Sequence, residues 1–139
     1  MSYTKLESQN NEDFKNDCNE NWRASRFRNR KTITDADSPY TIWQDDVEGS
    51  PLDDIEIDAT SGNVDINLIS ASLTDSDALK GRPIRFVRKD SSGNTVTIIR
   101  DGSDTIGYVA ANKTLASAGK CLQVVPDAVS NWDILTEIA

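Results

Sequence analysis

Residues 54–68 read DIEIDATSGNVDINL, and this stretch decides the kind of fold to expect. Apolar residues occupy every second position in two runs, 55–57 and 64–68, with acidic or amide residues between them. A two-residue period is typical of strands that bury one face. The link at 59–63 contains glycine and asparagine, which accept the positive φ of tight turns. The stretch therefore predicts two strands joined as a hairpin.

The same alternation recurs along the rest of the chain, with turn-forming residues between the runs at roughly ten-residue spacing. The further strands that we expect are 40–43, 83–89, 95–100, 105–108, 121–125 and 132–138. Residues 73–80 indicate a loop with one helical turn, and no strict internal repeat is evident. About seven or eight short strands in residues 39–139 predict an all-β domain, a small antiparallel β-sandwich or barrel of jelly-roll-like form.

Three apolar residues fall on strand faces that the alternation assigns to solvent: Val87, Ile99 and Leu135. Two explanations are open. Either both faces are packed within an ordinary sandwich, or a homo-oligomer supplies a second buried surface.

Residues 1–38 differ in composition from the rest of the chain. Seven basic and seven acidic residues cancel there, but five of the basic ones lie between 23 and 31. Apolar side chains are sparse, so a helix around 11–28 could not bury enough surface to offset its ordering cost. We interpret residues 1–38 as an extended N-terminal arm that docks on a partner, with a disordered tail as the alternative. The residues expected to dock are the apolar anchors Trp22 and Phe27 and the cations Arg23, Arg26, Arg28, Arg30 and Lys31.

Composition excludes several classes of protein. Asp and Glu outnumber Lys and Arg by 23 to 15, so the net charge is -8 and we expect no nucleic-acid partner. No apolar run approaches the ~20 residues of a membrane span, and the N-terminal residues offer no apolar signal-peptide core. Histidine is absent, which removes the commonest general base and most zinc sites. The two cysteines, Cys18 and Cys121, form no CxxC pair and are expected as reduced thiols.

The charged clusters do not indicate catalysis. Acidic pairs at 53–54 and 101–104 lie in strands or turns, where solvated charge is usual, rather than in a cleft that would separate their pKa values. No stretch fits a calcium loop or a glycine-rich phosphate loop, so we expect neither a metal nor a cofactor, and no enzyme. The basic residues at 82–89 are expected to pair with the acidic strands. The alternation places Arg85 on one face of its strand and Arg88 on the opposite, apolar side or past the strand's end.

Four motifs occur in a fixed order over about residues 53–138. They are Asp58-Ala59-Thr60-Ser61-Gly62-Asn63-Val64, Lys89-Asp90-Ser91-Ser92-Gly93-Asn94-Thr95-Val96-Thr97-Ile98, Asp101-Gly102-Ser103-Asp104-Thr105-Ile106 and Asn131-Trp132. In this order they resemble a β-rich domain common in tailed-phage structural proteins, found on tail fibres, tail spikes and virion surface proteins. The chain departs from that pattern at Ile69, where a proline commonly follows.

The resemblance implies a homotrimeric, non-enzymatic structural protein of a phage virion, assembled in the host cytoplasm. We expect a capsid decoration (cement) protein, because no shaft separates the arm from the β-domain. Its arm would bind the major capsid protein and its β-domain would trimerise outward. The alternative is a short tail fibre, attached to a tail adaptor protein, that contacts the host surface and its glycans. A separate carbohydrate-binding module is a third hypothesis, with the candidate aromatic residues Tyr40, Trp43, Tyr108 and Trp132.

Overall fold

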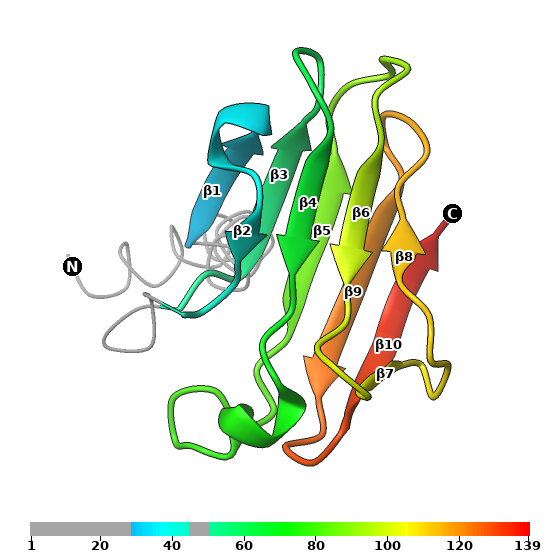
Figure 1. Cartoon of the computed structure of the whole chain (residues 1–139). Coiled ribbons are helices and arrows are strands. Elements are labelled where there is room, and N and C mark those ends of the chain that lie inside the picture. The colour runs from blue at the N-terminus through cyan, green and yellow to red at the C-terminus, as the bar shows by residue number, and fades with distance from the viewer. Residues whose placement is uncertain (1–28, 45–50) are drawn as a thin grey trace, which may run out of the picture.

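The computed structural model describes residues 29–44 and 51–139, which form two facing β-sheets (Figure 1). The six-stranded sheet has the order β1-β3-β5-β9-β10-β7, and the four-stranded sheet has the order β2-β4-β6-β8. The strands are β1 (Arg30–Thr34), β2 (Tyr40–Thr41), β3 (Asp54–Asp58), β4 (Val64–Asn67), β5 (Ile84–Arg88), β6 (Val96–Ile99), β7 (Thr105–Ile106), β8 (Lys113–Thr114), β9 (Cys121–Pro126) and β10 (Asn131–Ile138). Two short 3-10 helices, η1 (Asp35–Asp37) and η2 (Ala71–Thr74), lie in the connections. The prediction of a mostly β domain is confirmed.

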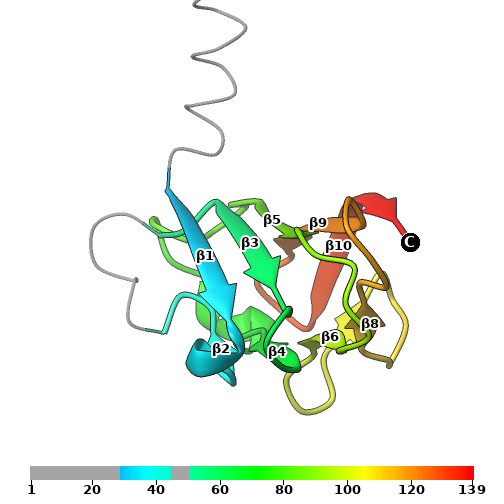
Figure 2. The same cartoon turned by 90° about the horizontal axis from the view of Figure 1, so that it is seen from above.

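The chain crosses from one sheet to the other after almost every strand. β1, β3 and β5 lie in the six-stranded sheet, whereas the strands that follow them, β2, β4 and β6, lie in the four-stranded sheet. Neighbouring strands of this part are parallel in both sheets. The segment from β1 to β6 therefore winds as a short β-solenoid, which we call the coil. The view from above shows its two layers facing each other (Figure 2). β9 and β10 close the six-stranded sheet with antiparallel pairing.

The predicted antiparallel, jelly-roll-like pairing is wrong. Of the eight strand pairings in the described residues, five are parallel and three are antiparallel. The hairpin expected within residues 54–68 is wrong as well, because β3 and β4 lie in opposite sheets and residues 59–63 arch between them. The physical reason is that alternation reports which face of a strand is buried but not which strand lies beside it.

The coil has a structural repeat that the sequence did not reveal. Arg30 and Asp54 are register partners 24 positions apart, whereas Asp54 and Arg85 are register partners 31 positions apart. The turns of the coil differ in length because segments such as the η2 loop are inserted between strands. A repeat of variable length leaves no fixed period in the sequence.

The hydrophobic core lies between the two sheets. Parallel register stacks similar side chains in rows, as where Ile66 of β4 lies beside Ile98 of β6, and both are fully buried. At the end of the core away from the β3–β4 arch, the rings of Trp43 and Trp132 pack with their centroids 5.6 Å apart. Trp43 Nε1 also donates a 2.8 Å hydrogen bond to the Leu52 carbonyl. These contacts fix the indole rings inside the domain.

β1 lies within the segment that the sequence assigned to the arm. It pairs with β3 along its length, and Ile33 is fully buried. Arg30 Nε lies 2.7 Å from Asp54 Oδ2, and Lys31 Nζ lies 4.9 Å from the centroid of the Tyr40 ring. In the structure, therefore, Arg30 and Lys31 make contacts within the β-domain.

Candidate functional site

Three arches stack at one end of the sandwich, at the top of Figure 1. They are residues 35–39, 59–63 and 89–95. The first two approach closely, since a Cβ placed on Gly62 would lie 3.0 Å from the Asp35 side chain. The second and third are joined by the Thr95 amide, which donates a 2.8 Å hydrogen bond to Asn63 Oδ1. The glycine and asparagine that the sequence indicated as hairpin residues instead allow one arch to lie on the next.

Ala59 is the point where the third arch binds the second. Asn94 Nδ2 and Ser92 Oγ donate to the Ala59 carbonyl over 2.7 and 3.0 Å, and the Ala59 amide donates to Asp90 Oδ1 over 2.8 Å. Both backbone groups of one residue are thus satisfied by side chains of the next turn of the coil.

Arg88 lies at the inner side of these arches and is only 2% exposed. Its guanidinium donates to the carbonyls of Asn94 and Leu115 over 2.7 and 2.8 Å and to the Ser92 carbonyl over 3.1 Å. Two further hydrogen bonds of 3.2 Å reach both carboxylate oxygens of Asp90. The cation is therefore paired in charge and also satisfies buried backbone carbonyls, as a charge inside a protein must. Of the two placements that the sequence left open for Arg88, the structure shows the one on the apolar side of the strand, at its last residue.

Asp90 is the anionic partner in this network. Burial acts to raise the pKa of Asp90, but hydrogen bonds from Arg88, from Ser92 and from the Ala59 and Ser92 amides outweigh it. The pKa of Asp90 consequently lies well below its usual value, and the carboxylate is ionised at neutral pH. The motif residues of these arches thus stabilise the fold and leave no reactive group in a cleft.

The predicted pairing of basic residues with the acidic strands is also confirmed. Asp54, fully buried on β3, accepts hydrogen bonds from Arg30 over 2.7 Å and from Arg85 over 2.8 Å. The hydrogen bond to Asp54 raises the pKa of Arg85 against the opposing effect of burial. Arg82 and Asp53 form a further ion pair of 2.8 Å. These cations neutralise acidic side chains of the same domain.

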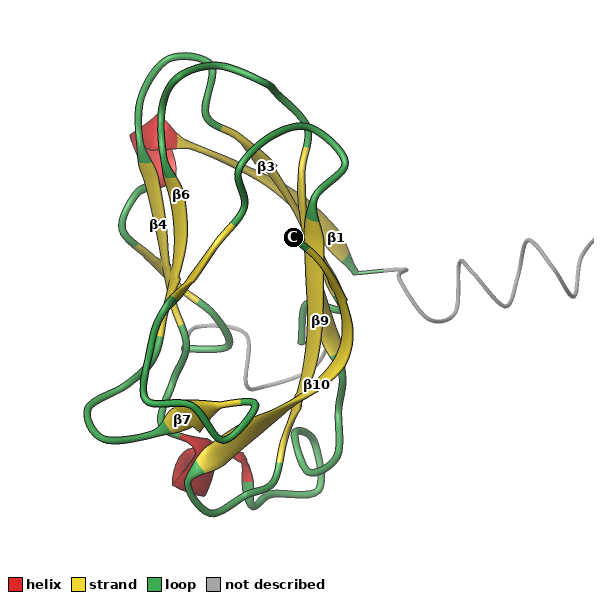
Figure 3. Cartoon of the chain, turned by 90° about the vertical axis from the view of Figure 1, so that its right-hand side faces the viewer, coloured by secondary structure: helices red, strands yellow, loops and turns green. Residues whose placement is uncertain are grey.

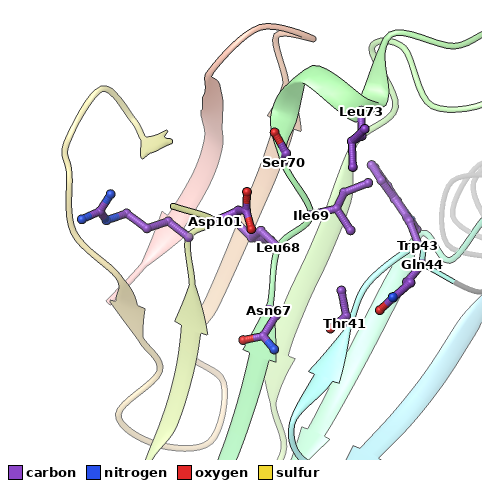
Figure 4. A pocket seen from close by; sticks show the side chains of 10 residues that line it. Thr41, Trp43, Gln44, Asn67, Leu68, Ile69, Ser70, Leu73 and Asp101 are labelled. Carbon is purple, nitrogen blue, oxygen red and sulfur yellow. The ribbon is translucent and has the colours of Figure 1, made fainter. Parts of the chain in front are cut away.

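An open pocket of about 540 Å³ lies at the other end of the sandwich, beside the ends of β2 and β4 and the η2 loop (Figure 4). Its apolar wall includes Leu68, Ile69 and Leu73, the last of which is 67% exposed. Its polar groups come from three turns of the coil, with Thr41 on β2 and Asn67 on β4 as register partners.

A second surface feature is a set of exposed apolar side chains on β10 and on the loop that follows β7. We call it the β10 edge patch and define it by Tyr108, Val109, Leu135 and Ile138, each of which is at least half exposed. β7 pairs only with the first two residues of β10, so among the described strands nothing pairs with the rest of this edge (Figure 3).

The loop between β7 and β8 is held against β10 at both ends. The Gly107 amide donates a 2.8 Å hydrogen bond to the Trp132 carbonyl, and Lys113 Nζ lies 2.9 Å from Glu137 Oε2. A hydrogen bond to Asp133 raises the pKa of Tyr108. The loop therefore lies beside β10, and both carry exposed apolar side chains.

The structure describes only two of the seven residues predicted to dock on a partner. Arg30 and Lys31 belong to β1, as described above. The others lie outside the described residues: Trp22, Arg23, Arg26, Phe27 and Arg28.

Cys121 is a buried free thiol.

Two absences concern residues 29–44 and 51–139 only. No group of three or more potential ligands is placed to hold a metal ion in that part of the chain. No helix described there is long and apolar enough to cross a membrane.

No protein-family model matches the chain, and no curated protein is similar to it.

Proposed function

We propose that this chain is a non-enzymatic structural protein of a tailed-phage virion, a capsid decoration protein that forms a homotrimer. In this proposal the β-domain self-associates and the N-terminal arm binds the major capsid protein. Trp22 and Phe27 serve as the apolar anchors of the arm, and its arginines contact acidic groups of the shell.

The β10 edge patch is the observation that carries the proposal. Tyr108 is 76% exposed beside the start of β10, and Leu135 is 50% exposed on the part of β10 whose outer edge no described strand pairs. Exposed apolar side chains next to an open strand edge favour association, because burial removes apolar area from water and the strand edge offers unpaired backbone groups. In a closed ring of three copies, the patch of each subunit would contact a different surface of the next subunit, so that it would be covered in every subunit.

The second support comes from the residues that resemble phage domains. Their polar groups bind one another in the arches, with Arg88 and Asp90 buried between them. Such a network stabilises a compact unit that must survive on a particle surface, and it supplies no nucleophile with an adjacent base. A trimer would also present three arms, so weak individual contacts with the shell would add through avidity.

A tail-fibre role is the second candidate, and the pocket beside η2 favours it. A concave site of about 540 Å³ on a displayed domain can take a ligand from a host surface. In that role the arm would bind a tail adaptor protein in place of the capsid.

The two candidates are separated by mixing the purified protein with phage heads that lack it and, in parallel, with isolated tails, followed by electron microscopy. Decoration predicts density at regular lattice points on the heads and none on the tails. Density only on the tails would establish the second candidate. If neither particle binds the trimer, both virion roles are excluded.

A further inference from the structure

We infer that the pocket beside η2 is a binding site for a neutral sugar ring. This inference depends on the pocket alone and not on where the protein is placed on a particle. It also differs from the carbohydrate-binding module considered from the sequence, which would bind sugars on aromatic rings such as that of Trp43. The Trp43 ring is fully buried and presents no open face.

The pocket is polar at its rim and aliphatic on one wall. Thr41, Gln44, Asn67 and Asp101 line it, and their side chains have no hydrogen-bond partner in the described part of the chain. Figure 4 shows these four side chains around the apolar Ile69. A hydroxyl, two amides and a carboxylate supply both donors and acceptors. Vicinal hydroxyl groups of a pyranose, each a donor and an acceptor, match that set.

The charges of the pocket argue against an anionic ligand. Among the described residues that line it, the only cation is Arg100, and Arg100 Nη1 is already bound to the carbonyls of Gly102 and Asp104 over 2.7 and 3.0 Å. Asp101 adds a negative charge at the rim, and the whole chain carries -8. A phosphate or carboxylate would therefore be repelled.

A purely apolar ligand fits equally poorly, because it would remove water from four polar side chains without replacing their hydrogen bonds. A sugar ring instead satisfies them with its hydroxyl groups and lays its C–H face on Ile69 and Leu73, the apolar lining side chains that are open to solvent. The site is also preorganised. Thr41 and Asn67 are on adjacent parallel strands, and the Ile42 amide donates to the Asn67 carbonyl over 3.0 Å.

The test is a titration of the ¹⁵N-labelled full chain with methyl glycosides of glucose, galactose, mannose and N-acetylglucosamine. We expect amide shifts confined to the pocket with at least one of these sugars. Asn67→Ala and Asp101→Asn should each weaken that binding about tenfold or more, because the first removes an amide that bonds the ligand and the second replaces a charged acceptor with a weaker, neutral one. Asp101 lies on an exposed loop, so its variant remains informative if Asn67→Ala fails to fold.

Thr97→Val is the matched control. Thr97 lies on β6 beside Asp65, on the same outer face of the four-stranded sheet but outside the pocket lining. We expect this variant to bind as the wild type does. The inference is overturned if none of the four sugars shifts the pocket amides, if inorganic phosphate shifts them instead, or if Thr97→Val weakens binding as much as Asp101→Asn.

Discussion

Replacing Arg88 by methionine tests whether the buried network holds the arches together. Methionine keeps an unbranched side chain of comparable reach, so the space is partly filled while the charge and the donors are lost. The change removes the hydrogen bonds of 2.7 and 2.8 Å to the carbonyls of Asn94 and Leu115. It also leaves the Asp90 carboxylate, now without its cation, in a largely buried position.

The expected loss of stability follows from these contacts. Removing one partner of a buried ion pair costs about 3–5 kcal/mol, and each buried carbonyl left without a donor adds about 1 kcal/mol or more. Because these contributions overlap, we expect the free energy of unfolding to fall by about 5 kcal/mol. A domain of this size has about 5–15 kcal/mol in total, so Arg88→Met should be close to unfolding.

The assay is urea denaturation followed by far-UV circular dichroism. Lys80→Met is the control, because Lys80 and Asp75 form an ion pair whose side chains are 69% and 62% exposed, and its loss should cost less than about 1 kcal/mol. In Arg88→Met/Asp90→Asn the uncompensated charge is absent, so the double variant should lose less than the sum of the two single changes. If Arg88→Met lost no more than Lys80→Met, the network would have no structural importance.

Three further predictions concern the arm, acid and self-association. Deletion of residues 1–28 should leave the unfolding midpoint nearly unchanged, whereas deletion of residues 1–38 removes β1 and should lower it strongly; equal midpoints would show that β1 adds nothing. Because the pKa of Asp90 is lower in the folded than in the unfolded state, its stabilisation is complete above about pH 4, the unfolded value, and is lost as the pH falls further. Denaturation from pH 7 to pH 2 should show this decline, and Asp90→Asn should flatten it; an unchanged slope in that variant would contradict the assignment. Leu135→Glu places a charge in the β10 edge patch and should shift sedimentation towards the monomer, whereas Leu73→Glu, exposed at the pocket, should not; similar effects of both would argue against a specific patch.

Strand faces could be predicted from the sequence, but strand partners could not. The alternation correctly buried Ile55 and Ile57, and it placed Arg85 and Arg88 on opposite faces of β5. It could not distinguish a hairpin from an arch, because Gly and Asn serve both kinds of turn. The deciding contact, Asn63 with Thr95, is between residues 32 positions apart and carries no local signal.

The pocket was not predicted for a similar reason. Thr41, Asn67 and Asp101 come from different turns of the coil, and no motif spacing connects them. Part of the β10 edge patch was predicted, since Leu135 broke the expected alternation. Tyr108 was noted only as an aromatic residue, because its place beside β10 depends on tertiary hydrogen bonds such as that from its amide to Asn131 Oδ1.

Mass in solution tests self-assembly through the β10 edge patch most directly. Sedimentation equilibrium of the full chain at micromolar concentration should give three times the chain mass of 15.3 kDa, and Leu135→Glu should return it to the mass of one chain. A single-chain mass for the wild type at every concentration reached would contradict the proposed trimer.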